Sequence, residues 1–167
     1  RNIDTKLRLA IFAMTEFALS RLIPSNRLRN NLSITVHLKH HAEGGEAMMS
    51  EATNPRRPRE FDVIVDHHRA EVDNYGRTRT DTEWGHEILK TLAHELVHVK
   101  QWAKGEMYEY VKSPMIRFHK TKFELDDINY WDYPWEIEAF GKQLGLFVRF
   151  CEDVGIADDD EMQEGVK

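Results

Sequence analysis

The chain has 167 residues, of which 41% are hydrophobic and 31% are charged, so it can bury one core and has the composition of a globular domain. Its formal net charge of −6 disfavours nonspecific binding to nucleic acid, which depends on neutralising phosphates. No apolar run reaches the roughly 20 residues that span a bilayer, and the single cysteine, Cys151, excludes an intrachain disulfide. We therefore expect no membrane partner and a cytoplasmic, reducing environment.

The first two elements are a helix and a strand. Apolar residues recur at helical spacing over 3–22, after Asn2 as a possible cap, and Pro24 ends this helix. Residues 32–38 alternate between apolar and polar side chains, which predicts a strand with one buried face.

Two more strands are expected before the middle of the chain. A turn at Gly44-Gly45 leads into a weaker strand over 46–53, and a loop follows from Asn54. The segment 60–66 predicts a stronger strand. Its residues expected to face the core are Phe61, Val63 and Val65.

The longest predicted helix follows a polar loop over 67–82. Asp81 or Thr82 can cap it, and it runs to about Lys104 before Gly105. The apolar side of this helix consists of Leu89, Leu92, Leu96, Val99 and Ala103.

The C-terminal third contains one more helix. Residues 106–133 show little periodicity and predict a long, aromatic-rich loop, whereas a helix starts at Pro134 and runs to about Cys151. We expect a single α+β domain over 1–155, with a small three-stranded mixed or antiparallel sheet, and a frayed acidic tail over 156–167.

The sequence HELVH within the central helix indicates a metal site. Residues four apart share one helix face, so His94 and His98 can offer imidazole nitrogens to one ion. Glu95 is rotated by about 100° from His94, so it borders the ion without binding it and can take a proton from the metal's water. This is the pattern of zinc hydrolases, in which a third protein ligand completes the site.

The third ligand must come from farther along the chain, and three residues compete. Glu136 borders the apolar face of the last helix and is followed by the small Ala139, which would allow a close approach to the central helix that carries HELVH, so we favour it. Glu138 precedes Lys142 by four residues, as in an exposed ion pair, and His119 lies in the aperiodic stretch. The residues expected to form the buried face are Ile137, Phe140, Leu144, Val148 and Cys151.

These motifs resemble those of a known class. HELVH followed by WEIEA on a later helix looks like the gluzincin zinc metallopeptidases, and the run over 84–145 is similar to small SprT-like or minigluzincin proteins of tailed phages and bacteria. The resemblance implies a zincin-like domain with His94, His98 and Glu136 as zinc ligands and Glu95 as the base. It implies the host cytoplasm if the chain is phage-encoded. Where many gluzincins have Asp or Asn to orient a histidine, this chain has Phe140.

Other side chains are weaker candidates. Tyr130 and Tyr133 precede the last helix and could donate a hydrogen bond to an oxyanion, although packing is the commoner role of such aromatics. A metal at Asp66-His67-His68 or at His40-His41 is less expected still, because neither has a partner at a fixed spacing. The pattern instead favours a loop at the end of a strand for Asp66-His67-His68.

The leading hypothesis is a zinc metallopeptidase that cleaves a peptide or protein substrate with a Glu-activated water. The substrate would lie along an edge strand supplied by 60–66 or 46–53. One alternative is a catalytically silent zinc-binding or virion-associated protein, against which the intact Glu95 argues. A second is a SprT-like DNA-associated protease, against which the acidic net charge argues.

Overall fold

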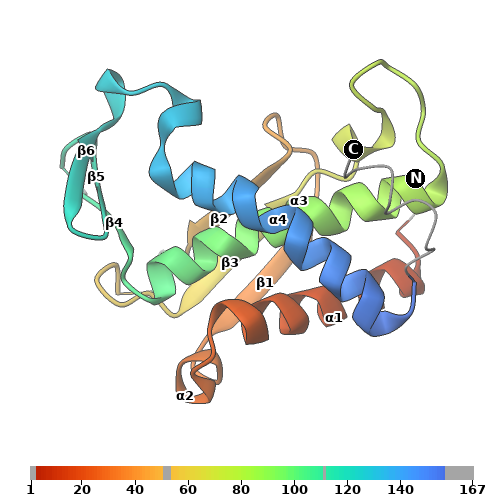
Figure 1. The fold of residues 1–167 in the computed structure, drawn as a ribbon, viewed down its shortest axis with the longest axis horizontal. Helices are drawn as coiled ribbons and strands as arrows, with labels where there is room; N and C mark the ends of the chain where they lie inside the picture. The colour runs from red at the N-terminus through yellow and green to blue at the C-terminus, as the bar shows by residue number, and fades with distance from the viewer. Residues whose placement is uncertain (1–2, 51–53, 111, 157–167) are drawn as a thin grey trace.

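A computed structural model describes residues 3–50, 54–110 and 112–156. In this part of the chain the fold is α+β, with a three-stranded mixed sheet and a second, antiparallel three-stranded sheet, which confirms the expected class (Figure 1). Nearly all of the expected acidic tail lies outside the described residues. Within them, no helix combines the length and the apolar character that crossing a membrane requires.

The N-terminal helix α1 (Thr5–Leu22) forms where its apolar spacing predicts it. Its cap is Asp4, whose carboxylate accepts the Leu7 N–H at 2.8 Å, and the expected cap Asn2 lies outside the described residues. A single turn of helix, α2 (Asn26–Arg29), follows.

The first sheet has the strand order β1-β3-β2, with β1 (Ser33–Leu38) parallel and β2 (Gly45–Met49) antiparallel to β3 (Glu60–Val65). The expectation that 60–66 could supply an edge is wrong, because β3 is central, whereas β2 is an edge strand. Residues expected to face the core on β3 are buried, as predicted: Phe61, Val63 and Val65.

The helix α3 (Asp81–Ala103) runs through the middle of the molecule and packs against α1, α4, β2 and β3 (Figure 1). Its cap is Thr80, one residue before the expected position, and Thr80 and Glu83 form a capping box. Gly105 ends the helix with φ +70°, a left-handed conformation that glycine adopts easily. The predicted apolar side is buried throughout: Leu89, Leu92, Leu96, Val99 and Ala103.

The stretch after α3 is not the loop that its lack of periodicity predicts. It contains the antiparallel sheet β4 (Met107–Glu109), β5 (Met115–Phe118) and β6 (Thr121–Glu124). Each strand has only three or four residues, too few to establish an alternating pattern. The remaining regular segments are single turns of 3-10 helix, η1 (Arg69–Glu71), η2 (Leu125–Asp127) and η3 (Tyr130–Asp132).

The last helix, α4 (Pro134–Val154), begins at the predicted proline and ends before Gly155. Its buried face is not the predicted one, because Ile137, Phe140 and Leu144 are 57%, 39% and 56% exposed. The helix instead turns a mixed face towards the molecule, which buries Trp135, Glu136, Ala139, Phe147, Phe150 and Cys151. Ala139 is fully buried, so it allows the close packing of α4 on α3.

Candidate metal centre

Three acceptor side chains from two helices converge on one point. His94 and His98 lie one turn apart on α3, and Glu136 lies in the first turn of α4. The two Nε2 atoms are 3.2 Å apart, and Glu136 Oε2 and Oε1 lie 3.2 Å from His94 Nε2 and 3.5 Å from His98 Nε2. All three residues are buried and lie close enough to bind one metal ion.

These separations fit the ligands of a small tetrahedral cation. With metal–ligand bonds of 2.0–2.1 Å, tetrahedral geometry places ligand atoms about 3.3 Å from one another. The three observed separations, between 3.2 and 3.5 Å, fall at that value. Two imidazoles and a carboxylate are also a donor set that zinc accepts.

Gln101 determines which nitrogen of His98 faces this point. Its amide Nε2 donates to the Trp135 carbonyl and to Glu138 Oε2, both at 3.0 Å, so its Oε1 is the atom that faces His98. The His98 Nδ1–H therefore donates to Gln101 Oε1 at 2.9 Å. In neutral His98, this leaves the Nε2 lone pair directed at His94 and Glu136.

His94 has the same arrangement through a residue of α4. Its Nδ1 lies 2.9 Å from Gln143 Oε1, so Nδ1 donates and Nε2 is left as the acceptor. Although burial alone would raise it, the adjacent His94 and His98 side chains lower the pKa of Glu136 to about 2, so its carboxylate is charged. Lone pairs and a negative charge thus face one another, which a bound cation would stabilise.

Glu95 lies beside this cluster and is not part of it. Its carboxylate is buried under β2, where it accepts a hydrogen bond from the Ala47 N–H. Burial raises the pKa of the Glu95 carboxyl, while the neighbouring His98 and His94 act in the opposite direction. A carboxylate with a raised pKa next to a cation site is suited to accept and return a proton.

The two candidate tyrosines differ in position. The Tyr130 hydroxyl donates to Glu136 Oε2 at 2.9 Å, which places it at the edge of the cluster. The Tyr133 hydroxyl instead donates to the Leu125 carbonyl at 2.9 Å, and its ring stacks on Trp135. The structure therefore brings Tyr130, but not Tyr133, to the metal-binding residues.

Glu138 is more than the exposed partner of Lys142 that its spacing suggests. It pairs with Lys142 at 2.7 Å, but it also pairs with the buried Lys100 at 2.7 Å and accepts from Gln101. Although burial alone would raise it, these contacts lower the pKa of Glu138 to about 2. Glu138 therefore holds Gln101, which in turn holds His98.

The weaker histidine candidates lie elsewhere. His119 occupies the β5–β6 turn and does not join the His94 cluster. His40, Asp66 and His68 form a second group, with His40 Nδ1 2.9 Å from Asp66 Oδ2. The Asp66 carboxylate already accepts the backbone N–H groups of His41, His68 and Arg69, so its main role is to hold the chain at the end of β3.

The cluster opens into a cleft. A cavity of about 440 Å³ runs from it along α3 towards Arg79, and a second of about 210 Å³ extends towards Trp102 and Glu109. Both are lined by His94, Glu95 and Tyr130, so the cluster lies where the two meet. An extended ligand can therefore occupy both sides of the metal-binding residues.

Sequence reasoning found neither glutamine that orients the histidines. Gln101 had a local signal, because it follows His98 by three residues on the same helix face. Gln143 follows Glu136 by seven residues, or about two turns, but its partner His94 is on another helix and only the fold brings them together. The chain matches no protein-family model, no curated protein and no solved structure.

Proposed function

We propose that this chain is a zinc-dependent peptidase of the gluzincin kind that its sequence resembles. The observation that supports this most is the convergence of His94, His98 and Glu136, with both histidines held in the tautomer that presents Nε2. A purely structural zinc site would need no ionisable base at its side, and Glu95 is such a base.

The chemistry divides between the metal and the chain. A zinc ion held by the three side chains would acidify a water molecule and polarise a substrate carbonyl. Glu95 would hold the attacking water by a hydrogen bond, take its proton and deliver that proton to the leaving amine. Tyr130 would border the bound peptide, and its hydroxyl, which donates to Glu136, would help to orient the Glu136 carboxylate towards the metal.

The outer edge of β2, whose Ala47 N–H donates to Glu95, offers a place for an extended substrate. The Ser50 N–H donates to the Glu60 carbonyl and the Gly44 carbonyl accepts from Asp66, so even-numbered residues of β2 face β3. The backbone groups of Gly45, Ala47 and Met49 therefore point away from β3, towards the edge where Ala47 meets Glu95. A peptide that pairs with this edge would pass over the metal-binding residues.

β2 lies so close to Glu95 at Gly45 that a larger residue there should disturb the Glu95 carboxylate. A Cβ at this position would lie 2.6 Å from Glu95 Oε1 and 2.7 Å from Thr91 Cγ2, closer than atoms in contact allow. Gly45→Ala should therefore displace the Glu95 carboxylate and lower kcat by about tenfold or more, because a small misplacement of a catalytic group is costly. Zinc affinity should stay unchanged, since the three ligand side chains are untouched, and isothermal titration calorimetry checks this.

Gly85→Ala is the matched control. Gly85 lies in α3, and a Cβ there would meet no atom within 4 Å. This variant should keep wild-type kcat and gain about 0.5–1 kcal/mol of stability from its higher helix propensity. Equal kcat in Gly45→Ala and Gly85→Ala would contradict the placement of Glu95 beside β2.

The proposed function is tested on the full chain. Purified protein that is stripped of metal and titrated with zinc should bind one ion per chain, and it should then hydrolyse an unfolded polypeptide such as a reduced, alkylated protein. A chelator should stop the hydrolysis and added zinc should restore it. Zinc binding at one equivalent without hydrolysis of any polypeptide in a diverse peptide library would reject the peptidase proposal.

A further inference from the structure

We propose that the outer edge of β1 is a dimerisation surface that pairs with β1 of a second copy of this chain. The two strands would run antiparallel about a two-fold axis and would join the two mixed sheets into one. This inference stands apart from the proposed peptidase function, because β1 lies on the opposite side of β3 from β2 and the metal-binding cleft.

The backbone of β1 is available for pairing. The Ser33 N–H donates to the Arg59 carbonyl and the Lys39 N–H donates to the Val65 carbonyl, so odd-numbered residues face β3. The backbone groups of Ile34, Val36 and Leu38 therefore point to the outer edge, where no described strand pairs with them. The strand has an unbroken register and contains no proline, lysine or bulge, which are the features that usually protect an edge.

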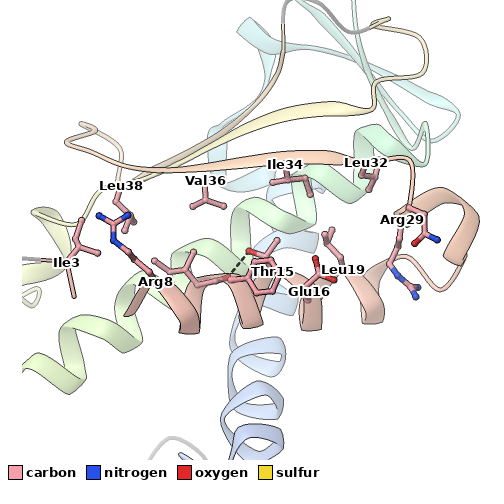
Figure 2. A pocket seen from close by; sticks show the side chains of 13 residues that line it. Ile3, Arg8, Thr15, Glu16, Leu19, Arg29, Leu32, Ile34, Val36 and Leu38 are labelled. Carbon is pink, nitrogen blue, oxygen red and sulfur yellow. Dashed lines mark hydrogen bonds between the residues drawn. The ribbon is translucent and has the colours of Figure 1, made fainter. Parts of the chain in front are cut away.

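An apolar groove lies below this edge. Figure 2 shows Ile34, Val36 and Leu38 of β1, and Leu32 just before it, pointing towards α1 across a cavity of about 710 Å³. Phe12 of α1 also lines this groove and is 67% exposed. An incoming strand would thus gain backbone hydrogen bonds and would also cover apolar surface.

On its α1 side, the groove carries one positive and one negative side chain, Arg8 and Glu16, which two copies of the chain could pair with each other. Arg8, Phe12 and Glu16 line the groove at successive turns of α1, with Phe12 midway between the two charges. Among the described residues, neither Arg8 nor Glu16 forms an ion pair with another side chain. A two-fold axis beside Phe12 would place Arg8 of each copy near Glu16 of the other, so both charges would be paired twice.

One axis can serve both the helix and the strand. In Figure 2, β1 runs alongside α1, with Leu38 near Arg8 and Ile34 near Thr15. Val36 therefore lies over the middle of the segment of α1 between Arg8 and Glu16. An axis at Val36 therefore also passes close to Phe12. An unrelated extended peptide could pair with the strand edge, but a second copy also matches the opposite charges of Arg8 and Glu16 about the same centre, which favours it as the occupant.

The test is analytical ultracentrifugation of the full chain over a wide concentration range. The expected species is a dimer with twice the 19.7 kDa mass of the chain. Arg8→Glu and Glu16→Arg should each raise the dimer Kd by about tenfold or more, because each places like charges together at two symmetric points. The double variant Arg8→Glu/Glu16→Arg should restore the wild-type Kd.

Lys6→Glu is the control, since Lys6 is an exposed cation of α1 that does not line the groove. It should leave the Kd unchanged, and circular dichroism should show that every variant is folded. A chain that stays monomeric at all concentrations overturns the proposal. A dimer that resists both single reversals, or that the double variant fails to restore, also overturns it, because the copies would then meet through another surface.

Discussion

Glu95→Gln is expected to bind zinc as tightly as the wild-type chain and to lose peptide hydrolysis by about 10²–10⁴-fold, the usual contribution of a general base. The amide has the same shape as the carboxylate but cannot accept a proton from water. Zinc affinity should survive because the converging acceptors are His94, His98 and Glu136, whereas the Glu95 carboxylate is held by the Ala47 N–H. Single-turnover kinetics with zinc-loaded enzyme would measure the effect.

Glu43→Gln is the matched control for this variant. Glu43 is exposed and lines the same cleft, and it does not belong to the metal-binding cluster. The same change of charge at this position should leave kcat within about twofold of wild type, because Glu43 offers no atom to the metal-binding cluster and substitutions of exposed residues cost little. Loss of zinc in Glu95→Gln would make Glu95 a ligand, and undiminished turnover would remove its role as the base.

Long periodic segments were predictable from sequence, whereas short ones were not. The structure confirms four elements that the sequence predicts, namely α1, α3, β1 and β3. Each was predictable because a helix or strand that packs one face on a core repeats apolar residues at a fixed spacing. The sheet β4-β5-β6 escaped prediction because its strands are too short to repeat a pattern and are stabilised by pairing with one another.

The apolar pattern of α4 was misleading at the site itself. Hydrophobicity alone predicts that Ile137, Phe140 and Leu144 face the core, but these side chains are exposed. The face against α3 carries the ionisable Glu136, whose burial is compensated by His94 and His98 rather than by apolar contacts. A helix that brings a ligand to a buried cluster is therefore oriented by that cluster, and Ala139 was the better clue to its packing face.

The surroundings of the cluster depend on contacts between distant parts of the chain. Lys100 is buried on α3 and pairs with Glu138 of α4 and with Glu106 in the turn after α3. A helical wheel of α4 alone shows Glu138 beside Lys142 and gives no sign of Lys100. The resulting sequence of contacts, from Lys100 through Glu138 to Gln101, could be recognised only after the two helices were docked.

Glu138→Ala should consequently cost more than the loss of an exposed ion pair. It leaves the buried Lys100 with one carboxylate partner in place of two, and this should lower the free energy of unfolding by about 1–2 kcal/mol. Gln101 would lose its hydrogen bond to Glu138 and keep only the one to the Trp135 carbonyl. Because Gln101 would then orient His98 less firmly, zinc affinity should fall by about tenfold. Chemical denaturation and zinc titration measure the two effects separately.

Glu136→Ala should have the larger effect on zinc, and the comparison between the two glutamates is the sharpest test of the site. This variant removes one of three converging ligands, so affinity should fall by more than about 100-fold, beyond the range for residues that only orient a ligand. Stability without metal should also fall, because the lowered pKa of Glu136 means that the folded chain stabilises this carboxylate, and the substitution leaves the Tyr130 hydroxyl without its acceptor. Competition titration against a chromophoric chelator resolves both affinities. If Glu138→Ala weakens zinc binding more than Glu136→Ala does, the carboxylate ligand is Glu138 and the cluster of His94, His98 and Glu136 is not the metal site.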